Sequence, residues 1–116
     1  MEYQIIEKKG YYIVKVLGKF NRKAIYSVRQ NLEPLLMKPN PIIVIDMGEL
    51  TVEEAELIYQ IGLLTAIRKG VKLAGGTIKI CSLKPNIMGF LHKNRLDVLF
   101  DLYENLDCAE QNYQRM

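Results

Sequence analysis

The hydrophobic and polar positions between Pro41 and Ile80 predict a strand, a long helix and a second strand. An unbroken apolar run ends in Asp46, and such a run is typical of a parallel strand that is buried on both faces. The run Thr77–Ile80 follows the helical segment and has the composition of the next strand. Two parallel strands joined by a helix form one right-handed crossover unit. We therefore expect the rest of the chain to be arranged around this unit.

The helix of this unit is predicted to span Val52–Leu73. Thr51 and Glu54 have the spacing of a capping box, which marks a helix start. Gly75 and Gly76 mark its end, where a residue with positive φ is favoured.

This helix carries more apolar surface than one buried face requires. One stripe is assigned to the sheet, and a second stripe lies roughly 100° around the helix. Either a neighbouring helix covers the second stripe, or the stripe is a contact surface for a partner or a second copy of the chain. The first stripe consists of Ile58, Ile61, Gly62 and Thr65, and the second of Tyr59, Leu63 and Ile67.

The segments before the crossover unit predict a hairpin and a helix. The β-rich runs Tyr3–Lys8 and Tyr11–Leu17 are separated by a Lys-Gly pair, which favours a tight turn. Apolar residues at helical spacing predict a helix over Arg22–Leu32. Pro34 removes one helical hydrogen bond, so we expect a kinked last turn that ends at Met37.

The segments after the crossover unit predict two short helices and one more strand. Pro85 suits the first turn of a helix. The apolar run Val98–Leu102 is predicted to be a strand, and Asn105 or Asp107 caps a last helix that runs to about Tyr113.

Together, these elements have the order β-β-α-β-α-β-α-β-α. A hairpin followed by alternating units predicts an α/β fold with a mixed sheet of four to five strands and about four helices packed against it. The sequence has 116 residues, and we expect 1–116 to form a single domain. Its hydrophobic content of 49% and charged content of 25% are typical of a soluble globular protein.

The composition argues against several classes of function. A net charge of +3 is too small to indicate nucleic acid, and neither a signal core nor a membrane-spanning run is present. Cys81 and Cys108 lack the spacing of metal ligands, so free thiols in a reducing, cytoplasmic compartment are expected. His92 is the single histidine, and neither a phosphate loop nor a nucleophile–base pair can be found. We expect no enzyme, no metal and no cofactor.

Charge is distributed unevenly along the chain. The segment that leads into the long helix is acidic, whereas the stretch from Leu57 to Leu96 contains no Asp or Glu. The folded domain should then have an acidic end and a basic end, which suits steering of a partner or head-to-tail self-association. Ordinary solvated faces would give the same pattern. The acidic residues are Asp46, Glu49, Glu53, Glu54 and Glu56, and the basic ones are Arg68, Lys69, Lys72, Lys79, Lys84, Lys93 and Arg95.

Several short motifs resemble the STAS domain, the fold of bacterial anti-sigma factor antagonists. The resemblance covers nearly the whole chain, and its motifs are moderately specific as a set. They are Val44-Ile-Asp46 at the end of a strand, Ile61-Gly-Leu-Leu64 in the long helix, Ala74-Gly-Gly-Thr-Ile-Lys-Ile80, Ser82-Leu-Lys-Pro85 and Leu96-Asp-Val-Leu-Phe100.

The sequence departs from this family at the phosphorylation site. There the long helix usually begins with an Asp-Ser-Ser-Gly-Leu segment in which one serine accepts phosphate, whereas the segment Thr51–Gly62 contains no serine and about three extra residues. Glu53, Glu54 and Glu56 either supply fixed negative charge in place of a phosphoserine or simply stabilise a helix start. Thr51 is either a substitute acceptor or a plain N-cap. A third possibility is that phosphate never controls the domain.

The resemblance implies a non-enzymatic regulatory module in bacterial signalling and transcription regulation, which binds an anti-sigma factor or a related ATPase-type kinase. The residues predicted to contact this partner are Glu49, Thr51, Glu53, Glu54, Glu56, Tyr59 and Leu63. One alternative is a sensor that holds a nucleotide or lipid between helices. Another is a homodimeric scaffold that associates through Tyr59, Leu63 and Ile67.

Overall fold

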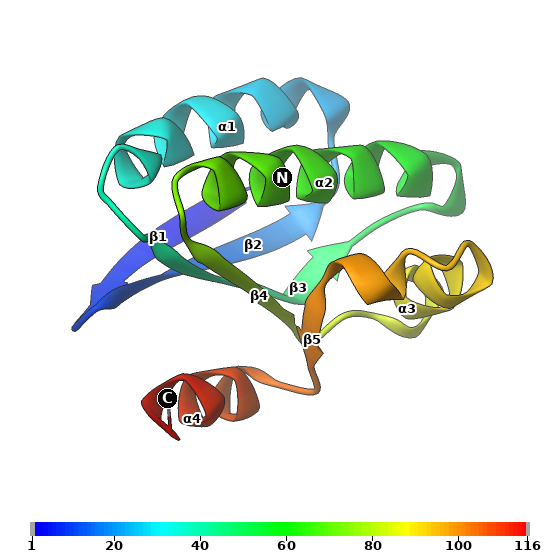
Figure 1. The fold of residues 1–116 in the computed structure, drawn as a ribbon. Coiled ribbons are helices and arrows are strands. Elements are labelled where there is room, and N and C mark those ends of the chain that lie inside the picture. Colours follow the sequence, from blue (N-terminus) through cyan, green and yellow to red (C-terminus); the bar gives the residue numbers. More distant parts are fainter. Residues whose placement is uncertain (1, 116) are drawn as a thin grey trace.

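The structure of the protein is a computed structural model that describes residues 2–115, without the side chains of residues 22–25 and 112–115. It contains a mixed five-stranded sheet and four helices, so the predicted α/β class and element order are confirmed (Figure 1). The strands are β1 (Glu2–Lys8), β2 (Tyr11–Lys19), β3 (Ile42–Thr51), β4 (Thr77–Cys81) and β5 (Asp101–Tyr103). The helices are α1 (Arg22–Leu36), α2 (Leu57–Leu73), α3 (Pro85–Lys93) and α4 (Leu106–Arg115), with short 3-10 helices η1 (Glu54–Glu56) and η2 (Asp97–Leu99).

The strands lie in the sheet in the same order as in the chain. β1 and β2 form the predicted antiparallel hairpin, in which Gly10 has φ of 90°. From β2 to β5 all neighbours are parallel. Parallel neighbours need a crossover, and α1, α2 and α3 each lie between two consecutive parallel strands in the chain. α1 and α2 lie on one face of the sheet, and α4, which follows β5, lies on the other (Figure 1).

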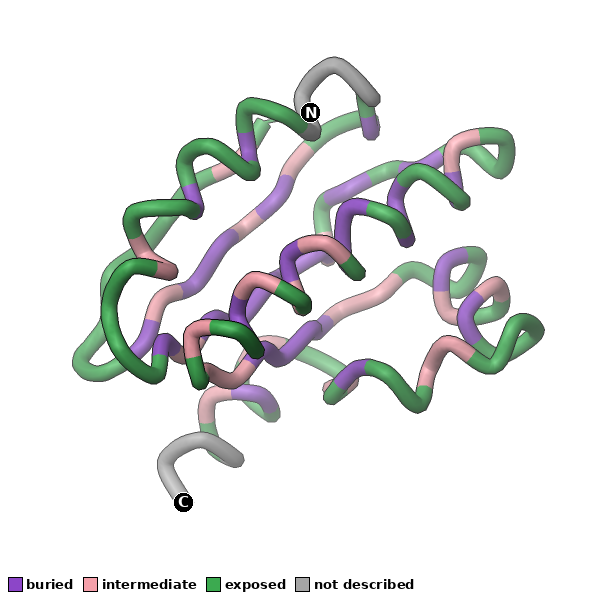
Figure 2. The backbone as a smooth tube through the Cα atoms, turned by 45° about the horizontal axis from the view of Figure 1, so that its top comes forward, coloured by how far each residue is buried: buried purple, intermediate pink, exposed green. Residues whose placement is uncertain are grey.

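Apolar side chains fill both faces of the sheet. A large core lies between the sheet and α1, α2 and α3, and a smaller one lies under α4. Figure 2 shows the buried positions along the central strands and on the inner side of α2. In β3, Ile43 and Ile45 belong to the large core and Val44 to the smaller one, which confirms a strand buried on both faces.

The end of α2 follows the prediction closely. Gly75 has φ of 76°, its N–H donates to the carbonyl of Lys72 at 3.0 Å, and the N–H of Gly76 donates to the carbonyl of Val71 at 2.8 Å. This pair of bonds is the Schellman motif, which satisfies carbonyls that the last helical turn leaves open.

The predicted start of this helix is wrong. β3 continues to Thr51, because beyond a bulge its last residues pair with Leu17–Lys19 of β2. The turn η1 comes next, and α2 begins only at Leu57, without a side-chain cap. Thr51 is therefore the end of a strand and not a capping residue.

The stripes predicted on α2 also need correction. Ile61 is buried as expected, but Ile58 is 67% exposed, and Gly62 and Thr65 face solvent. Leu63 and Ile67 of the second stripe are buried in the large core instead. Ile67 lies in the groove where α1 passes α2, so a neighbouring helix covers this end of the stripe. Tyr59, at the other end of the stripe, is 44% exposed.

α1 continues through Pro34 to Leu36, one residue short of the predicted end at Met37, and Leu36 is packed against the large core. One boundary elsewhere differs from the prediction. The strand predicted at Val98–Leu102 is divided: η2 comes first, with Val98 82% exposed, and β5 begins only at Asp101.

Candidate functional site

The candidate site is the segment Glu49–Tyr59, which joins β3 to α2 at the carboxyl end of the parallel strands. We call it the docking segment. Leu50, Val52 and Leu57 are buried in the large core and anchor it. The remaining side chains point outward, apart from a half-buried Glu56. Loops at this end of a parallel sheet are where α/β folds usually bind their ligands.

Hydrogen bonds from neighbouring elements hold the backbone of the docking segment. The N–H of Phe20 donates to the carbonyl of Thr51 at 2.8 Å. The side-chain amide of Asn86, in the first turn of α3, donates to the carbonyl of Val52 at 3.0 Å. Because both bonds come from other elements, the segment is fixed to the sheet and to α3.

Two lysines of β2 lie against acidic residues of the docking segment. Lys15 Nζ lies 3.8 Å from Glu49 Oε1, and Lys19 Nζ lies 2.6 Å from Glu53 Oε1. The hydrogen bond with Glu53 raises the pKa of Lys19. Two of the acidic residues are therefore paired with cations. This reduces the net negative charge available to imitate a phosphoserine.

The structure brings most of the predicted contact residues to one surface. Glu49, Thr51, Glu53, Glu54 and Tyr59 are exposed there. Leu63 is 4% exposed and belongs to the large core, so in this conformation it cannot contact a partner.

One exposed residue of this surface is Ile58, which was predicted from the sequence to pack against the sheet. The buried face of α2 includes Leu57, Gln60, Ile61 and Leu64, and Ile58 falls outside it. Apolar residues occur at helical spacing on more than one side of α2, so the spacing alone did not identify the buried face. Together, Ile58 and Tyr59 give the docking segment an exposed apolar side next to its carboxylates.

The predicted basic end is only partly formed. Lys69 and Lys72 are exposed in the second half of α2. Lys79 is instead buried under α4, where its Nζ donates to the carbonyl of Ala109 at 3.3 Å and lies 5.4 Å from the centre of the Tyr103 ring. Burial lowers the pKa of Lys79. Its role is to join α4 to the sheet, beside the bond that the Tyr11 hydroxyl donates to Glu110.

The two cysteines are both free, as expected, and their surroundings differ. Cys81 is buried in the smaller core, whereas Cys108 is exposed on α4. Burial raises the pKa of the Cys81 thiol to about 12, and the nearby Asp46 adds to this shift. The thiolate is the reactive form, so Cys81 should be inert in the folded protein.

We expect a thiol reagent at pH 8 to modify one cysteine of the native protein, Cys108, and Cys81 only after denaturation. Mass spectrometry of the modified peptides checks this.

The raised pKa of Cys81 also makes the stability of the protein depend on pH. The unfolded thiol has an ordinary pKa of about 9.0, so the stabilisation of the folded protein by the neutral thiol is complete below pH 9 and is lost as pH rises toward 12. The slope is at most about 1.4 kcal/mol per pH unit. Between pH 8 and pH 10.5, the free energy of unfolding measured in urea should fall less in Cys81→Ala than in the wild type. An equal fall in both proteins would contradict this assignment.

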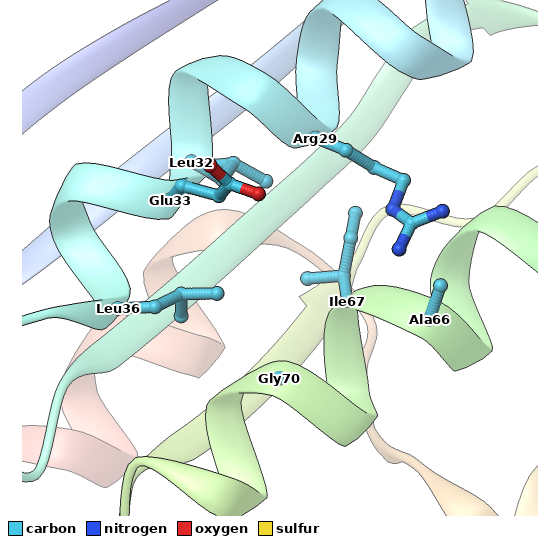
Figure 3. A pocket seen from close by; sticks show the side chains of 7 residues that line it. All are labelled: Arg29, Leu32, Glu33, Leu36, Ala66, Ile67 and Gly70. Carbon is cyan, nitrogen blue, oxygen red and sulfur yellow. The ribbon is translucent and has the colours of Figure 1, made fainter.

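A second feature is a cavity of about 190 Å³ between α1 and α2. Figure 3 shows its apolar side chains, Leu32 and Leu36 from α1 and Ile67 from α2. The charged side chains of Arg29 and Glu33 also extend into this groove from α1 (Figure 3). An apolar floor with two charged groups can accept a small amphipathic molecule.

The described residues supply no obvious metal site. Within them, no three His, Cys, Asp or Glu side chains gather closely enough to hold an ion. In the same part of the chain, every helix is too short or too polar to cross a bilayer.

Sequence comparison found no matching protein-family model and no matching curated protein. Comparison of structures did find matches. The anti-sigma factor antagonist SpoIIAA in its unphosphorylated form superposes with a TM-score of 0.78 at 10% identity, over 99% of this chain and 98% of that one.

Two other solved structures are similar over comparable lengths. An anti-sigma factor antagonist from Mycobacterium paratuberculosis has a TM-score of 0.76 at 20% identity, over 96% of this chain and 92% of that one. A serine-to-glutamate variant of RsbS from Moorella thermoacetica has the same TM-score and identity over the full length of both chains. This chain therefore has the STAS fold, as its sequence motifs predicted.

Proposed function

We propose that this protein is a non-enzymatic regulatory module that binds an anti-sigma factor or a related ATPase-type kinase through its docking segment. The observation that carries the proposal is the end-to-end match of its fold to anti-sigma factor antagonists. A bacterial, cytoplasmic setting belongs to the same proposal, and the bacterial origin of the similar structures supports it.

The surface chemistry of the docking segment supports this role. Ile58 and Tyr59 are exposed apolar side chains on a segment that the core holds in place. A fixed aromatic and aliphatic pair loses little conformational entropy on binding and forms a typical interface centre. Around this pair, Glu54 and the ion-paired Glu53 supply a polar, acidic rim. The expected partner surface is an apolar pocket with basic residues at its edge.

The proposed module is not switched by phosphate on a serine. The sequence has only two serines, Ser27 in α1 and Ser82 after β4, and neither belongs to the docking segment. Thr51 is the exposed aliphatic hydroxyl nearest in sequence to the start of α2. Incubation with ATP and the recovered kinase should leave the mass of the protein unchanged. A phosphate on Thr51, located by peptide mass spectrometry, would show that a switch has been kept.

The test of the proposal is an affinity capture from lysate of the source organism, with ATP and then with ADP. We expect an ATPase-type anti-sigma kinase among the captured proteins. Ile58→Glu should weaken its binding at least tenfold, since it places a charge in the apolar centre of the interface. The matched control is Leu73→Glu, which adds the same charge at an 81% exposed position at the far end of α2. Equal binding by both variants would refute the docking segment.

A small-ligand sensor is the second candidate function, and the cavity between α1 and α2 favours it. A volume of about 190 Å³ is below the roughly 300 Å³ of typical ligand sites. The end of an acyl chain fits this space better than a nucleotide does. A medium-chain fatty acid at a hundred times its Kd should stabilise the protein by about 2.7 kcal/mol. Thermal shift measures this, and Ala66→Phe, which fills the cavity, should abolish the shift.

A further inference from the structure

β1 is an edge strand that offers seven consecutive residues for pairing. Within the described part of the chain, the sheet ends at β1, and β2 is the strand that pairs with it. All of β1 except the half-buried Tyr3 is exposed, and Ile5 and Ile6 are 37% and 38% exposed. An open edge of this length is a template for another strand, and natural proteins usually shorten or block such edges. The opposite edge, β5, has only three residues.

The hairpin determines which residues of β1 point their backbone groups outward. Lys8 and Tyr11 are partners across a two-residue turn, and residues in this position exchange hydrogen bonds. Along an antiparallel pair, hydrogen-bonded and non-hydrogen-bonded positions alternate. The even-numbered residues of β1 are therefore bonded to β2. The odd-numbered residues Tyr3, Ile5 and Glu7 direct their N–H and C=O groups to the open edge.

We propose that β1 pairs antiparallel with β1 of a second copy of this chain, centred on Ile5. In this register Ile5 faces its own copy, Tyr3 faces Glu7, and Glu2 faces Lys8 of the other chain. Each outward residue meets an outward residue, which gives about six backbone hydrogen bonds. Opposite charges meet at both ends of the paired segment, and such cross-strand pairs are stabilising. The two sheets would then form one continuous sheet.

Other registers of the two β1 strands give fewer paired residues and fewer charge pairs. Hydrogen bonding allows shifts of two residues only, since an odd shift would place an outward residue opposite an inward one. Centring the pair on Gln4 places Glu2 opposite Ile6, and centring it on Ile6 places Lys8 opposite Gln4. Both shifts lose the charge pairs and leave fewer β1 residues paired. The sequence of β1 therefore selects the Ile5-centred arrangement.

This surface differs from the homodimer contact that the sequence suggested. That contact used Tyr59, Leu63 and Ile67, of which Leu63 and Ile67 are buried in the large core. The edge of β1 lies on the side of the sheet away from β4 and β5 (Figure 1). Self-association through β1 is independent of the proposed partner, so either proposal can fail alone.

The test is sedimentation velocity of the purified protein from about 5 to 500 μM. We expect a concentration-dependent dimer, and Ile5→Lys should give monomers because two like charges would meet at the two-fold axis. Glu2→Lys alone should raise the dissociation constant about tenfold, because it places lysine opposite lysine at both ends. The double variant Glu2→Lys with Lys8→Glu should restore the wild-type dissociation constant. All of these side chains are exposed, so circular dichroism should show unchanged folding.

Cross-linking tests the register itself. In a Cys108→Ser background, Ile5→Cys should form an intermolecular disulfide readily, since hydrogen-bonded antiparallel partners have Cα atoms about 5.5 Å apart. The control Glu2→Cys should not, because Glu2 faces Lys8. A monomer at every concentration overturns the proposal. A dimer that is unaffected by Ile5→Lys, or that the double variant fails to restore, overturns it as well.

Discussion

Replacing Leu63 by glutamate is expected to unfold the protein, and not to convert a dimer into folded monomers. Leu63 is 4% exposed and belongs to the large core. Loss of a buried leucine costs about 3 kcal/mol, and burial of a carboxylate adds a comparable cost. The sum is a large part of the roughly 5–15 kcal/mol that stabilises a small domain. Circular dichroism and urea unfolding measure the effect.

The matched control for this variant is Ile58→Glu. The same charge is introduced on the same helix, but at a position that is 67% exposed. We expect its unfolding free energy to stay within about 0.5 kcal/mol of the wild type. Acid should partly rescue Leu63→Glu, because burial raises the pKa of the new carboxyl and its penalty disappears as pH falls toward 4. A stable, folded Leu63→Glu protein at pH 7 would mean that α2 presents a different face.

Gly76→Ala should give the second largest loss, about 3 kcal/mol or more. A Cβ at Gly76 would lie 2.1 Å from the carbonyl oxygen of Pro41 and 2.8 Å from its ring. The same carbonyl accepts the N–H of Thr77 at 2.8 Å, where β4 begins beside β3. The clash is with backbone, so relief requires the two central strands to separate at their start. A fall in the urea midpoint measures the loss.

Gly62→Ala is the comparison that separates this clash from a general effect of replacing glycine. Gly62 lies in the middle of α2, and a Cβ there meets no atom within 4 Å. Alanine is favoured over glycine in a helix by about 0.8–1.0 kcal/mol, so this variant should be more stable than the wild type. If both variants lost stability equally, the close contact at Pro41 would be ruled out as the cause.

The elements of the fold could be predicted because their signals are local. Gly10 and Gly75 have positive φ where the sequence required it, and Pro85 occupies the first turn of α3. The apolar run of β3 has the length and composition of a strand buried on both faces, and the structure buries it in this way. Such signals depend on a few neighbouring residues, so they can be read without knowledge of the tertiary structure.

The start of α2 could not be predicted because it is decided by a distant strand. Glu49–Thr51 remain extended because they pair with Leu17–Lys19, which lie some thirty residues earlier. The capping-box pattern at Thr51 is a local preference that this pairing overrides. The errors at Ile58 and Leu63 have another origin, because the residues of a helix keep their relative angles wherever the helix begins. The sequence offers more than one apolar stripe on α2, and packing in the core selects the one that contains Leu57, Ile61 and Leu64.

The burial of Lys79 has a similar origin. Its charge assigned it to the basic end of the domain in the sequence. Its burial depends on α4, which is formed by the last residues of the chain and covers that part of β4. A lysine beside Ile78 and Ile80 in a central strand could have suggested a covering element, because such strands are normally buried on both faces.

The agreement between strand order and chain order has a consequence for synthesis on the ribosome. Each new strand pairs with the strand made immediately before it, so the sheet can grow from β1 toward β5 as the chain emerges. No strand has to insert between two that are already paired. The incomplete sheet always ends in the newest strand, and its exposed edge is covered by the next segment to leave the exit tunnel. Chain elongation and sheet growth thus proceed in the same direction.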